Sequence, residues 1–181
     1  MSEEQPKKMS EFAELTEAAS TVDNETQRME SEETTTHIAE GGWFPYPPSR
    51  PARLIPPIAL AYIGDAVYEV AVRQYLLSKP NMRPNHLHRS ATGLVSAKAQ
   101  SRILTGIEPE LTEEERDMVR QGRNAKSGSV PKNADVLEYR HATALECLIG
   151  YLYSSGQHDR MIALIGRGIE HAEQQAQSST K

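Results

Sequence analysis

The sequence predicts an all-α domain preceded by an acidic tail. Apolar residues recur every three or four positions over several long stretches, which is the spacing of an amphipathic helix. Signals for helix starts and stops bound these stretches: Thr112 stands three residues before Glu115, as in a capping box, and Gly156 is suited to end a helix. No stretch has a convincing strand pattern. Together these observations favour a helical bundle.

Six helical stretches follow from these signals. Pro57 suits the first turn of the first helix, where a missing N–H group costs nothing. Ser96 is an N-cap candidate, and the segment from Gly106 to Pro109 interrupts the helical pattern. The expected helices span about residues 57–77, 86–95, 97–104, 113–124, 134–153 and 159–175.

Apolar periodicity also predicts which side chains are buried. Four tyrosines in the expected helices, and the single cysteine, are expected to pack rather than to stack on bases or to act as a nucleophile. The predicted buried positions are Leu60, Ile63, Val67 and Val70 on the first helix, Leu145, Leu148, Ile149 and Leu152 on the fifth, and Ile162, Ile165 and Ile169 on the sixth. The tyrosines concerned are Tyr62, Tyr68, Tyr139 and Tyr153.

Composition limits the class of protein. A chain of 181 residues suits one domain with room for a tail. Its single cysteine, Cys147, excludes an internal disulfide and a cysteine-rich zinc site. No apolar run is long enough to cross a bilayer, and the start of the chain lacks the form of a signal peptide. We therefore expect a cytoplasmic protein without a membrane partner.

The net charge of −5 is unevenly distributed. Residues 1–40 hold three basic and eleven acidic side chains, so the remainder holds seventeen basic against fourteen acidic ones. Residues 1–42 are rich in Glu, Thr, Ser and Gln and are expected to form a disordered tail. Six of the eleven prolines lie in residues 43–57, a predicted proline-rich linker. The domain itself should span residues 58–176, with a flexible end at 177–181, and its mildly basic charge permits a polyanionic partner.

Two acidic residues interrupt apolar helices. Asp65 follows Gly64 beside the apolar face of the first helix, and Glu146 stands among leucines of the fifth. A carboxylate on a largely buried helix needs a cation, a donor or a metal as its partner. Two such carboxylates on separate helices can share a hard divalent cation, and Mg²⁺ is favoured over zinc because no cysteine or paired histidine accompanies them. Alternatively, each acid pairs with an arginine or lies on an exposed stripe.

A basic stretch joins the fourth and fifth helices. Six basic residues and only three acidic ones lie between Arg116 and Arg140. The segment from Arg123 to Asn133 is a loop by its Gly, Ser, Pro and Asn content. Such a loop can follow a nucleic-acid backbone, whose phosphates bind lysine and arginine. The alternative is an ordinary solvated loop.

Several segments resemble one family. Residues 59–69, Ala-Leu-Ala-Tyr-Ile-Gly-Asp-Ala-Val-Tyr-Glu, look like the signature helix of ribonuclease III, and residues 145–153 resemble its second acidic helix. The segments Leu87-His88, 95–100 and 123–126 also look like parts of the short relatives called the Mini-ribonuclease III family. The resemblance covers about residues 55–154. No double-stranded-RNA-binding domain is expected after the last helix. The lack of that domain is the defining trait of the group.

The resemblance implies a specific activity. It implies an all-helical endonuclease domain that works as a homodimer and cleaves double-stranded RNA with Mg²⁺, in bacteria the precursor of large-subunit (23S) ribosomal RNA. Asp65 and Glu146 match the acids of the family that bind the metal and act in catalysis. A ribosomal protein that presents the RNA is a plausible partner. The rival interpretation is a non-catalytic RNA-binding or ribosome-associated protein with the same fold.

The chain departs from full-length ribonuclease III at two acidic positions. Ala61 and Thr143 stand where that enzyme has a further glutamate and aspartate, so RNA oxygens and water would have to complete the metal's ligands. Glu69 and Thr143 are candidates for the surroundings of the metal, although Glu69 equally suits a salt bridge. The RNA-binding candidates are Arg123 and Lys126 first, followed by Lys132, Lys98 and Arg140.

Overall fold

The computed structural model describes residues 42–80, 83–125 and 135–178. The chain divides into two units, Met1–Pro47 and Pro48–Lys181, and every described helix belongs to the second. Within the described residues there is no strand, so the predicted all-α class is confirmed. The predicted tail, residues 1–42, lies almost wholly outside the described part of the chain, and the boundaries of linker and domain stay predictions.

The helices lie close to their predicted positions. The predicted end of the third helix at about residue 104 is wrong, because α4 continues through Gly106 to Ile107 and a short 3₁₀ turn follows. The other boundaries differ by up to three residues. The elements are η1 (Ala52–Leu54), α2 (Pro57–Ser78), α3 (Pro84–Val95), α4 (Ala97–Ile107), η2 (Glu108–Glu110), α5 (Glu113–Asn124), α6 (Val136–Ser154) and α7 (His158–Ser178).

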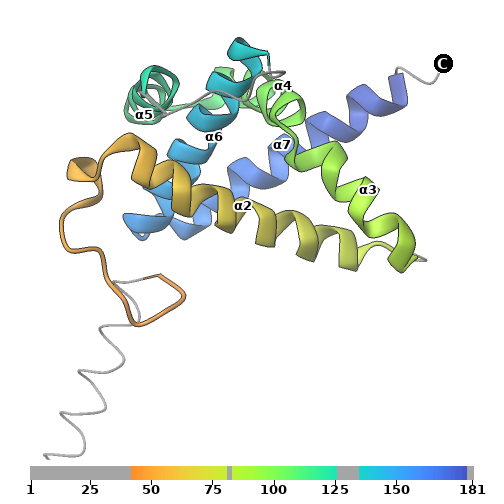
Figure 1. Cartoon of the computed structure of the whole chain (residues 1–181), viewed down its shortest axis with the longest axis horizontal. Coiled ribbons are helices and arrows are strands. Elements are labelled where there is room, and N and C mark those ends of the chain that lie inside the picture. The colour runs from red at the N-terminus through yellow and green to blue at the C-terminus, as the bar shows by residue number, and fades with distance from the viewer. Residues whose placement is uncertain (1–41, 81–82, 126–134, 179–181) are drawn as a thin grey trace, which may run out of the picture. The chain divides into compact units, whose positions relative to one another are not determined.

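Helix α6 is the centre of the bundle. It packs on α2, α4, α5 and α7. Figure 1 shows α6 crossing α2, with α4 and α5 above α2 in that view. Eleven of its residues are buried, including the four that the periodicity predicts. A helix that is apolar on almost every side is expected at the middle of a helical domain. An acid in the buried part of α6, from Ala142 onward, must therefore face a contact with another helix or a gap between helices.

Two predicted core positions are wrong. Val70 on α2 is 48% exposed and Ile162 on α7 is 63% exposed. The buried face of α2 instead runs through Gly64, which the apolar pattern leaves out, because α6 crosses α2 at that glycine. On α7 the buried residue of the first turn is Met161, one position before Ile162, whereas Ile165 and Ile169 are buried as predicted.

Local signals fix the helix ends as expected. The backbone N–H of Thr112 donates to Glu115 Oε2 (2.7 Å), and the N–H of Glu115 donates to Thr112 Oγ1 (3.2 Å), which completes the capping box. Ser96 caps α4 by accepting from the Ala99 N–H, and Asp135 caps α6. Gly156 has a φ of +72°, the left-handed conformation that favours glycine after a helix.

One buried ion pair connects α5 to α7. Glu115 is buried, and Arg160 donates to both of its carboxylate oxygens, at 2.7 and 2.9 Å. These bonds hold the pKa of Glu115 below its ordinary value, mainly through Arg160. Because the pair joins side chains of two different helices, it serves the packing of the bundle.

No helix in the described ranges combines the length and the apolar content that a membrane span requires.

Candidate functional site

The candidate site is built on a close crossing of α2 and α6. A Cβ atom added to Gly64 would lie 1.9 Å from the backbone oxygen of Glu146 and 2.7 Å from the backbone nitrogen of Gly150. A Cβ atom added to Gly150 would lie 1.9 Å from the backbone oxygen of Leu60. Only glycine permits two helix backbones to come this close. Because Asp65 follows Gly64 directly, the crossing brings Asp65 close to the turn of α6 that carries Glu146.

The two predicted acids are brought together in this way. Burial is the main cause of the raised pKa of Glu146, and the Asp65 carboxylate is near enough for its charge to add to this rise. The structure corrects one expectation, because Asp65 is exposed and only Glu146 is partly buried. Among the described residues neither acid forms an ion pair, so the alternative of an arginine partner for each is not observed.

Both carboxyl groups have raised pKa values. Burial raises the pKa of Glu146 to about 7, repulsion from Asp65 adds to this, and a hydrogen bond from Gln100 opposes it. Partial desolvation raises the pKa of Asp65, and the negative charge of Glu69 adds to the effect while Arg73 opposes it. Near neutral pH the ionised pair is therefore short of positive charge, which a divalent cation would supply.

The raised pKa of Glu146 predicts that the stability of the metal-free protein depends on pH. The folded state holds a proton on Glu146 up to about pH 7, whereas an ordinary glutamate loses it near 4.5. The contribution of Glu146 to the free energy of unfolding is therefore complete below pH 4.5 and is lost as the pH rises to 7. The loss is at most about 3 kcal/mol.

The measurement is the melting temperature in EDTA between pH 5 and 8, for the wild type and for Glu146→Gln. The neutral variant should be more stable than the wild type at pH 8, and the difference should shrink toward pH 5. Adding Mg²⁺ at pH 8 should stabilise only the wild type. Parallel curves for the two proteins would show that the surroundings of Glu146 do not disfavour its charge.

The predicted surroundings of the metal have other contacts. Glu69 is half-buried and pairs with Arg73 at 2.5 Å, as the salt-bridge alternative expects. The hydroxyl of Thr143 donates to the backbone oxygen of Tyr139 (3.1 Å), one turn back on α6. Ala61 and Thr143, which stand where full-length ribonuclease III has its further acids, are both buried. The role of Glu69 and Thr143 near a metal therefore stays a prediction.

Sequence reasoning missed two residues of the site. Gly150 forms the crossing together with Gly64, and Gln100 of α4 is buried with its amide beside Glu146. Both lie in segments that resemble the family. The sequence offered one signal for each: Gly150 lies in the apolar stretch of α6, and Gln100 lies on the side of α4 that carries the apolar residues. Their partners are on other helices, which the pattern within one helix does not indicate.

The predicted basic residues fall into three groups. Lys126 and Lys132 lie outside the described residues. Lys98, Arg123 and Arg140 are exposed, and in the described part of the chain none of them takes part in an ion pair. By contrast, Arg116 and Arg120 of the same basic stretch pair with acids on their own helix, Glu113 and Asp117.

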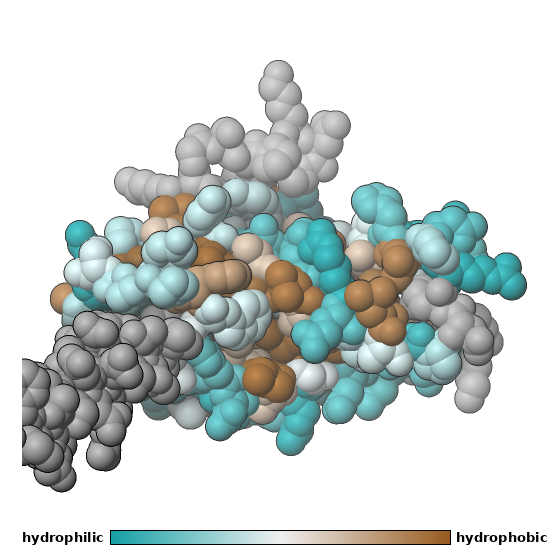
Figure 2. All heavy atoms as spheres, turned by 90° about the horizontal axis from the view of Figure 1, so that it is seen from below, coloured by the Kyte–Doolittle hydropathy of each residue, from teal (hydrophilic) through white to brown (hydrophobic). Residues whose placement is uncertain are grey.

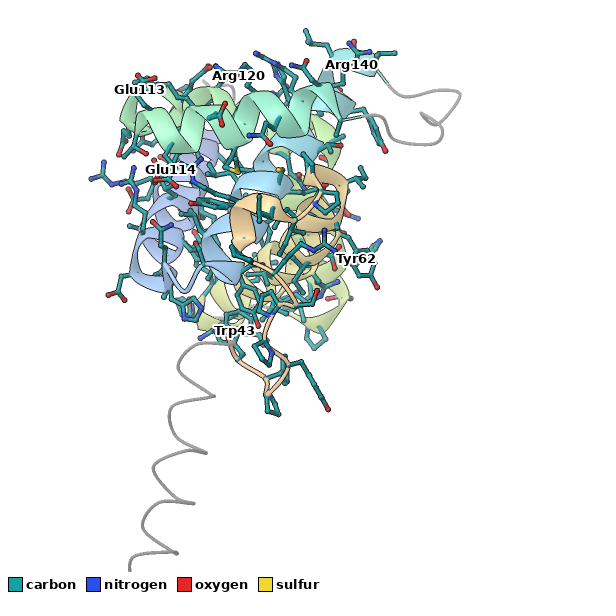
Figure 3. The ribbon with its side chains drawn as sticks, turned by 90° about the vertical axis from the view of Figure 1, so that its left-hand side faces the viewer. Trp43, Tyr62, Glu113, Glu114, Arg120 and Arg140 are labelled. Carbon is teal, nitrogen blue, oxygen red and sulfur yellow. The ribbon has the colours of Figure 1, made fainter. Side chains whose placement is uncertain are left out.

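A basic surface extends from these residues onto α4. Arg102 is exposed one turn after Lys98, and Ser101 beside it lies within hydrogen-bonding distance of His141 Nδ1 on α6 (3.1 Å). This bond connects the exposed side of α4 to the first turns of α6, where Arg140 lies. Figure 3 shows Arg120 and Arg140 along one edge of the molecule, with the acidic Glu113 and Glu114 at the other end of α5.

The residues at the crossing fit a hard divalent cation. Asp65 and Glu146 offer only oxygen ligands, and neither forms an ion pair among the described residues. The described residues contain no group of three or more histidine, cysteine, aspartate or glutamate side chains suited to a metal. A cation held by two carboxylates would keep several other ligand positions for water or substrate, as Mg²⁺ usually does.

Known proteins show the same domain. Residues 58–157 match the family model described as the Ribonuclease III domain. The chain is 48% identical over 125 residues to the Mini-ribonuclease 3 of Brevibacillus brevis, covering 69% of this chain and 93% of that protein. It is 51% identical over 110 residues to the Mini-ribonuclease 3 of Enterococcus faecalis, covering 60% and 83%.

A solved structure agrees with these relatives. The X-ray structure of a protein from Fusobacterium nucleatum aligns with a TM-score of 0.59 at 30% identity. The alignment covers 67% of this chain and 98% of that one. The chain therefore belongs to the ribonuclease III family, and within it to the Mini-ribonuclease 3 group.

Proposed function

We propose that this endoribonuclease cleaves double-stranded RNA with Mg²⁺ bound by Asp65 and Glu146. Membership of the family supports the activity on double-stranded RNA, and one observation of the structure carries the choice of residues. The crossing of α2 and α6 at Gly64 brings the two acids together without a cationic partner among the described residues. A pair of carboxylates in this state favours a divalent cation.

The protein's contribution to catalysis is to hold two carboxylates on rigid helices. When bound, Mg²⁺ supplies a water molecule activated for attack on phosphorus and neutralises charge on the leaving oxygen. Glu146 has a pKa of about 7 in the free protein and must lose its proton before it can act as a ligand. Because the chain offers few acidic ligands, phosphate oxygens of the RNA are expected to complete the shell.

The exposed cations on α4, α5 and α6 are proposed to bind the RNA backbone. A-form RNA is recognised mainly through its phosphates, its 2′-hydroxyls and its shape, which suits flexible basic side chains. Lys98, Arg123 and Arg140 are available for this among the described residues, and Lys126 and Lys132 remain proposed contacts. The Ser101–His141 bond and Arg102 add polar groups to the same surface.

Replacing both Arg123 and Arg140 by alanine should weaken RNA binding without affecting the fold, because both side chains are exposed. Each lost phosphate contact lowers the slope of log affinity against log salt by about 1, and the double variant should bind roughly tenfold more weakly at low salt. Binding is measured with an uncleavable duplex in Ca²⁺ or EDTA. Arg167→Ala is the control, since Arg167 is an exposed arginine that pairs with Glu110 (3.1 Å) on another part of the surface. An equal salt slope in wild type and double variant would contradict the assignment.

We also propose that two copies assemble through the exposed side of α2. Tyr62, expected to pack within the chain, is instead 84% exposed at the edge of the molecule in Figure 3, and Ile58 and Val70 on the same helix are also exposed. Figure 2 shows apolar residues among polar ones on the face where α2 lies. A second copy would cover these residues and bring two centres to one duplex. Sedimentation should show a dimer, and a stable monomer would contradict this assembly.

The decisive experiment compares substrates and metals. The full chain is incubated with long double-stranded RNA, single-stranded RNA and duplex DNA, each in Mg²⁺ and in EDTA. We expect cleavage of double-stranded RNA in Mg²⁺ only. Binding of the duplex without cleavage in either Mg²⁺ or Mn²⁺ would reject the proposal in favour of a non-catalytic RNA-binding protein.

The natural substrate is proposed to be the precursor of 23S ribosomal RNA in the cytoplasm. The names of the relatives support a ribonuclease, and the basic surface supports an RNA duplex as its substrate. The test is cleavage of a precursor transcript with and without the ribosomal protein that binds it. Cutting at defined positions supports this substrate, whereas random cutting contradicts it.

A further inference from the structure

Gln100 is a buried polar residue whose place in the core has a cost. Its side chain is 1% exposed on α4, and its Oε1 has no hydrogen-bond partner among the described residues. A buried polar atom without a partner is unfavourable by about 1–3 kcal/mol, so an apolar side chain of the same size would pack better at this position. Packing alone therefore does not account for a glutamine here.

The amide nitrogen of Gln100 has two contacts. It donates to the backbone oxygen of Val95 (3.2 Å), the last residue of α3. The side chain also lies beside the Glu146 carboxyl group and acts on it as a hydrogen-bond donor that opposes the rise in the pKa of that group. A glutamine NH₂ group has two hydrogens, so one can be held by the α3–α4 corner while the other is directed at Glu146.

A ligand carboxylate needs such a partner most when ligands are few. Asp65 and Glu146 are the only acids at the crossing that lack an ion-pair partner in the described residues, so a wrong orientation of Glu146 removes half of the available protein ligands. Groups that orient metal ligands through hydrogen bonds typically change metal affinity by about 10–100-fold when they are removed. Because Val95 fixes one side of the amide, Gln100 can hold the carboxylate in one orientation.

We propose that Gln100 is a positioning residue that orients the Glu146 carboxylate for binding of the divalent cation. The inference rests on the proposed function, because it assumes that Glu146 is a metal ligand. Gln100 itself touches neither RNA nor metal in this role. The Oε1 atom of Gln100 lacks a hydrogen-bond partner among the described residues. This is unfavourable for stability, and it results from placing an amide donor beside Glu146 within the core.

The test measures metal binding as well as cleavage. In Gln100→Leu the amide is lost while the size of the side chain is kept. We expect Mn²⁺ to bind the full-length variant about tenfold more weakly than the wild type by titration calorimetry without RNA. The Mg²⁺ concentration for half-maximal cleavage should rise by a similar factor, while kcat at saturating Mg²⁺ changes little. The melting temperature in EDTA should be equal to or higher than that of the wild type.

The control is Gln121→Leu. Gln121 is a half-buried glutamine that likewise donates to a carboxylate, Asp117 Oδ2 (2.8 Å), but on α5 away from the crossing. Its Mn²⁺ affinity should equal that of the wild type. If Gln100→Leu does not fold, Gln100→Met removes the same donor with a flexible apolar chain.

Two outcomes would overturn the inference. Unchanged Mn²⁺ affinity in the variant, with the wild type binding normally, would show that Gln100 serves only to connect α3 to α4 and α6. Failure of the wild type itself to bind Mn²⁺ and to cleave double-stranded RNA would reject the proposed function, and this inference with it. The wild-type measurement therefore distinguishes the two failures.

Discussion

Asp65→Asn is expected to reduce cleavage of double-stranded RNA by about 1000-fold or more at saturating Mg²⁺. The substitution keeps the size of the side chain and removes one of the two charges proposed to hold the cation. Several kcal/mol of transition-state stabilisation come from a catalytic metal, and each 1.4 kcal/mol is a factor of ten in rate. The measurement is the single-turnover rate on a defined duplex.

Other properties of this variant should change little. Asp65 is exposed, so the melting temperature should stay near that of the wild type, and removing its charge relieves Glu146 of repulsion. Duplex binding in EDTA should be equal or slightly tighter, because one negative charge near the phosphates is gone. Asp159→Asn is the control, since Asp159 is also an exposed aspartate on a helix but lies at the start of α7.

A double substitution tests whether the two acids act as one unit. Residues that share one catalytic role are strongly non-additive, so Asp65→Asn with Glu146→Gln should be about as slow as either single variant. Multiplying effects would show that the acids act independently. If Asp65→Asn retains more than a tenth of the wild-type rate, the proposed centre is wrong.

Local signals explain why the helices could be predicted. The Thr112–Glu115 capping box, the Ser96 cap and the glycine at 156 act over three or four residues, and each has the expected geometry. The same signals failed at Gly106, where α4 continues because a single glycine is tolerated inside a helix and the next residue, Ile107, is buried in the core. Helix boundaries therefore followed from neighbours in sequence.

Contacts between helices could be predicted only in part. Asp65 and Glu146 were identified because each interrupts an apolar face, and the resemblance connected them. Which sides of α2 and α7 are buried was wrong at Val70 and Ile162, because the apolar period does not include the glycines at which helices approach. The exposure of Tyr62 has a related cause, since hydropathy does not distinguish burial within the chain from a surface open to a partner.

Gly64→Ala is expected to destabilise the protein by more than about 4 kcal/mol, or to prevent folding. The added Cβ would lie 1.9 Å from the Glu146 backbone oxygen and 2.7 Å from the Gly150 backbone nitrogen. Both atoms belong to the backbone of α6, so no side-chain movement can relieve the clash. Separating α2 from α6 would open the centre of the bundle, which is among the few changes with effects of this size. The measurement is chemical unfolding, with soluble yield as a second readout.

The matched control is Gly166→Ala. Gly166 lies inside α7, and nothing is within 4 Å of the position that its Cβ would take. Alanine there should stabilise the helix by about 0.5–1 kcal/mol, because it restricts the unfolded chain more than glycine does. The two substitutions add the same methyl group to a helix interior, so their opposite signs isolate the effect of the crossing.

The crossing also connects stability to function. If Gly64→Ala folds, α2 and α6 must be further apart, so the Asp65 carboxylate must have moved relative to Glu146. Its Mn²⁺ affinity should then fall even at temperatures where the variant is fully folded, and the repulsion that raises the Glu146 pKa should weaken. A folded Gly64→Ala with wild-type metal affinity would mean that the close approach at Gly64 serves packing alone, and that the two acids do not depend on it for their position.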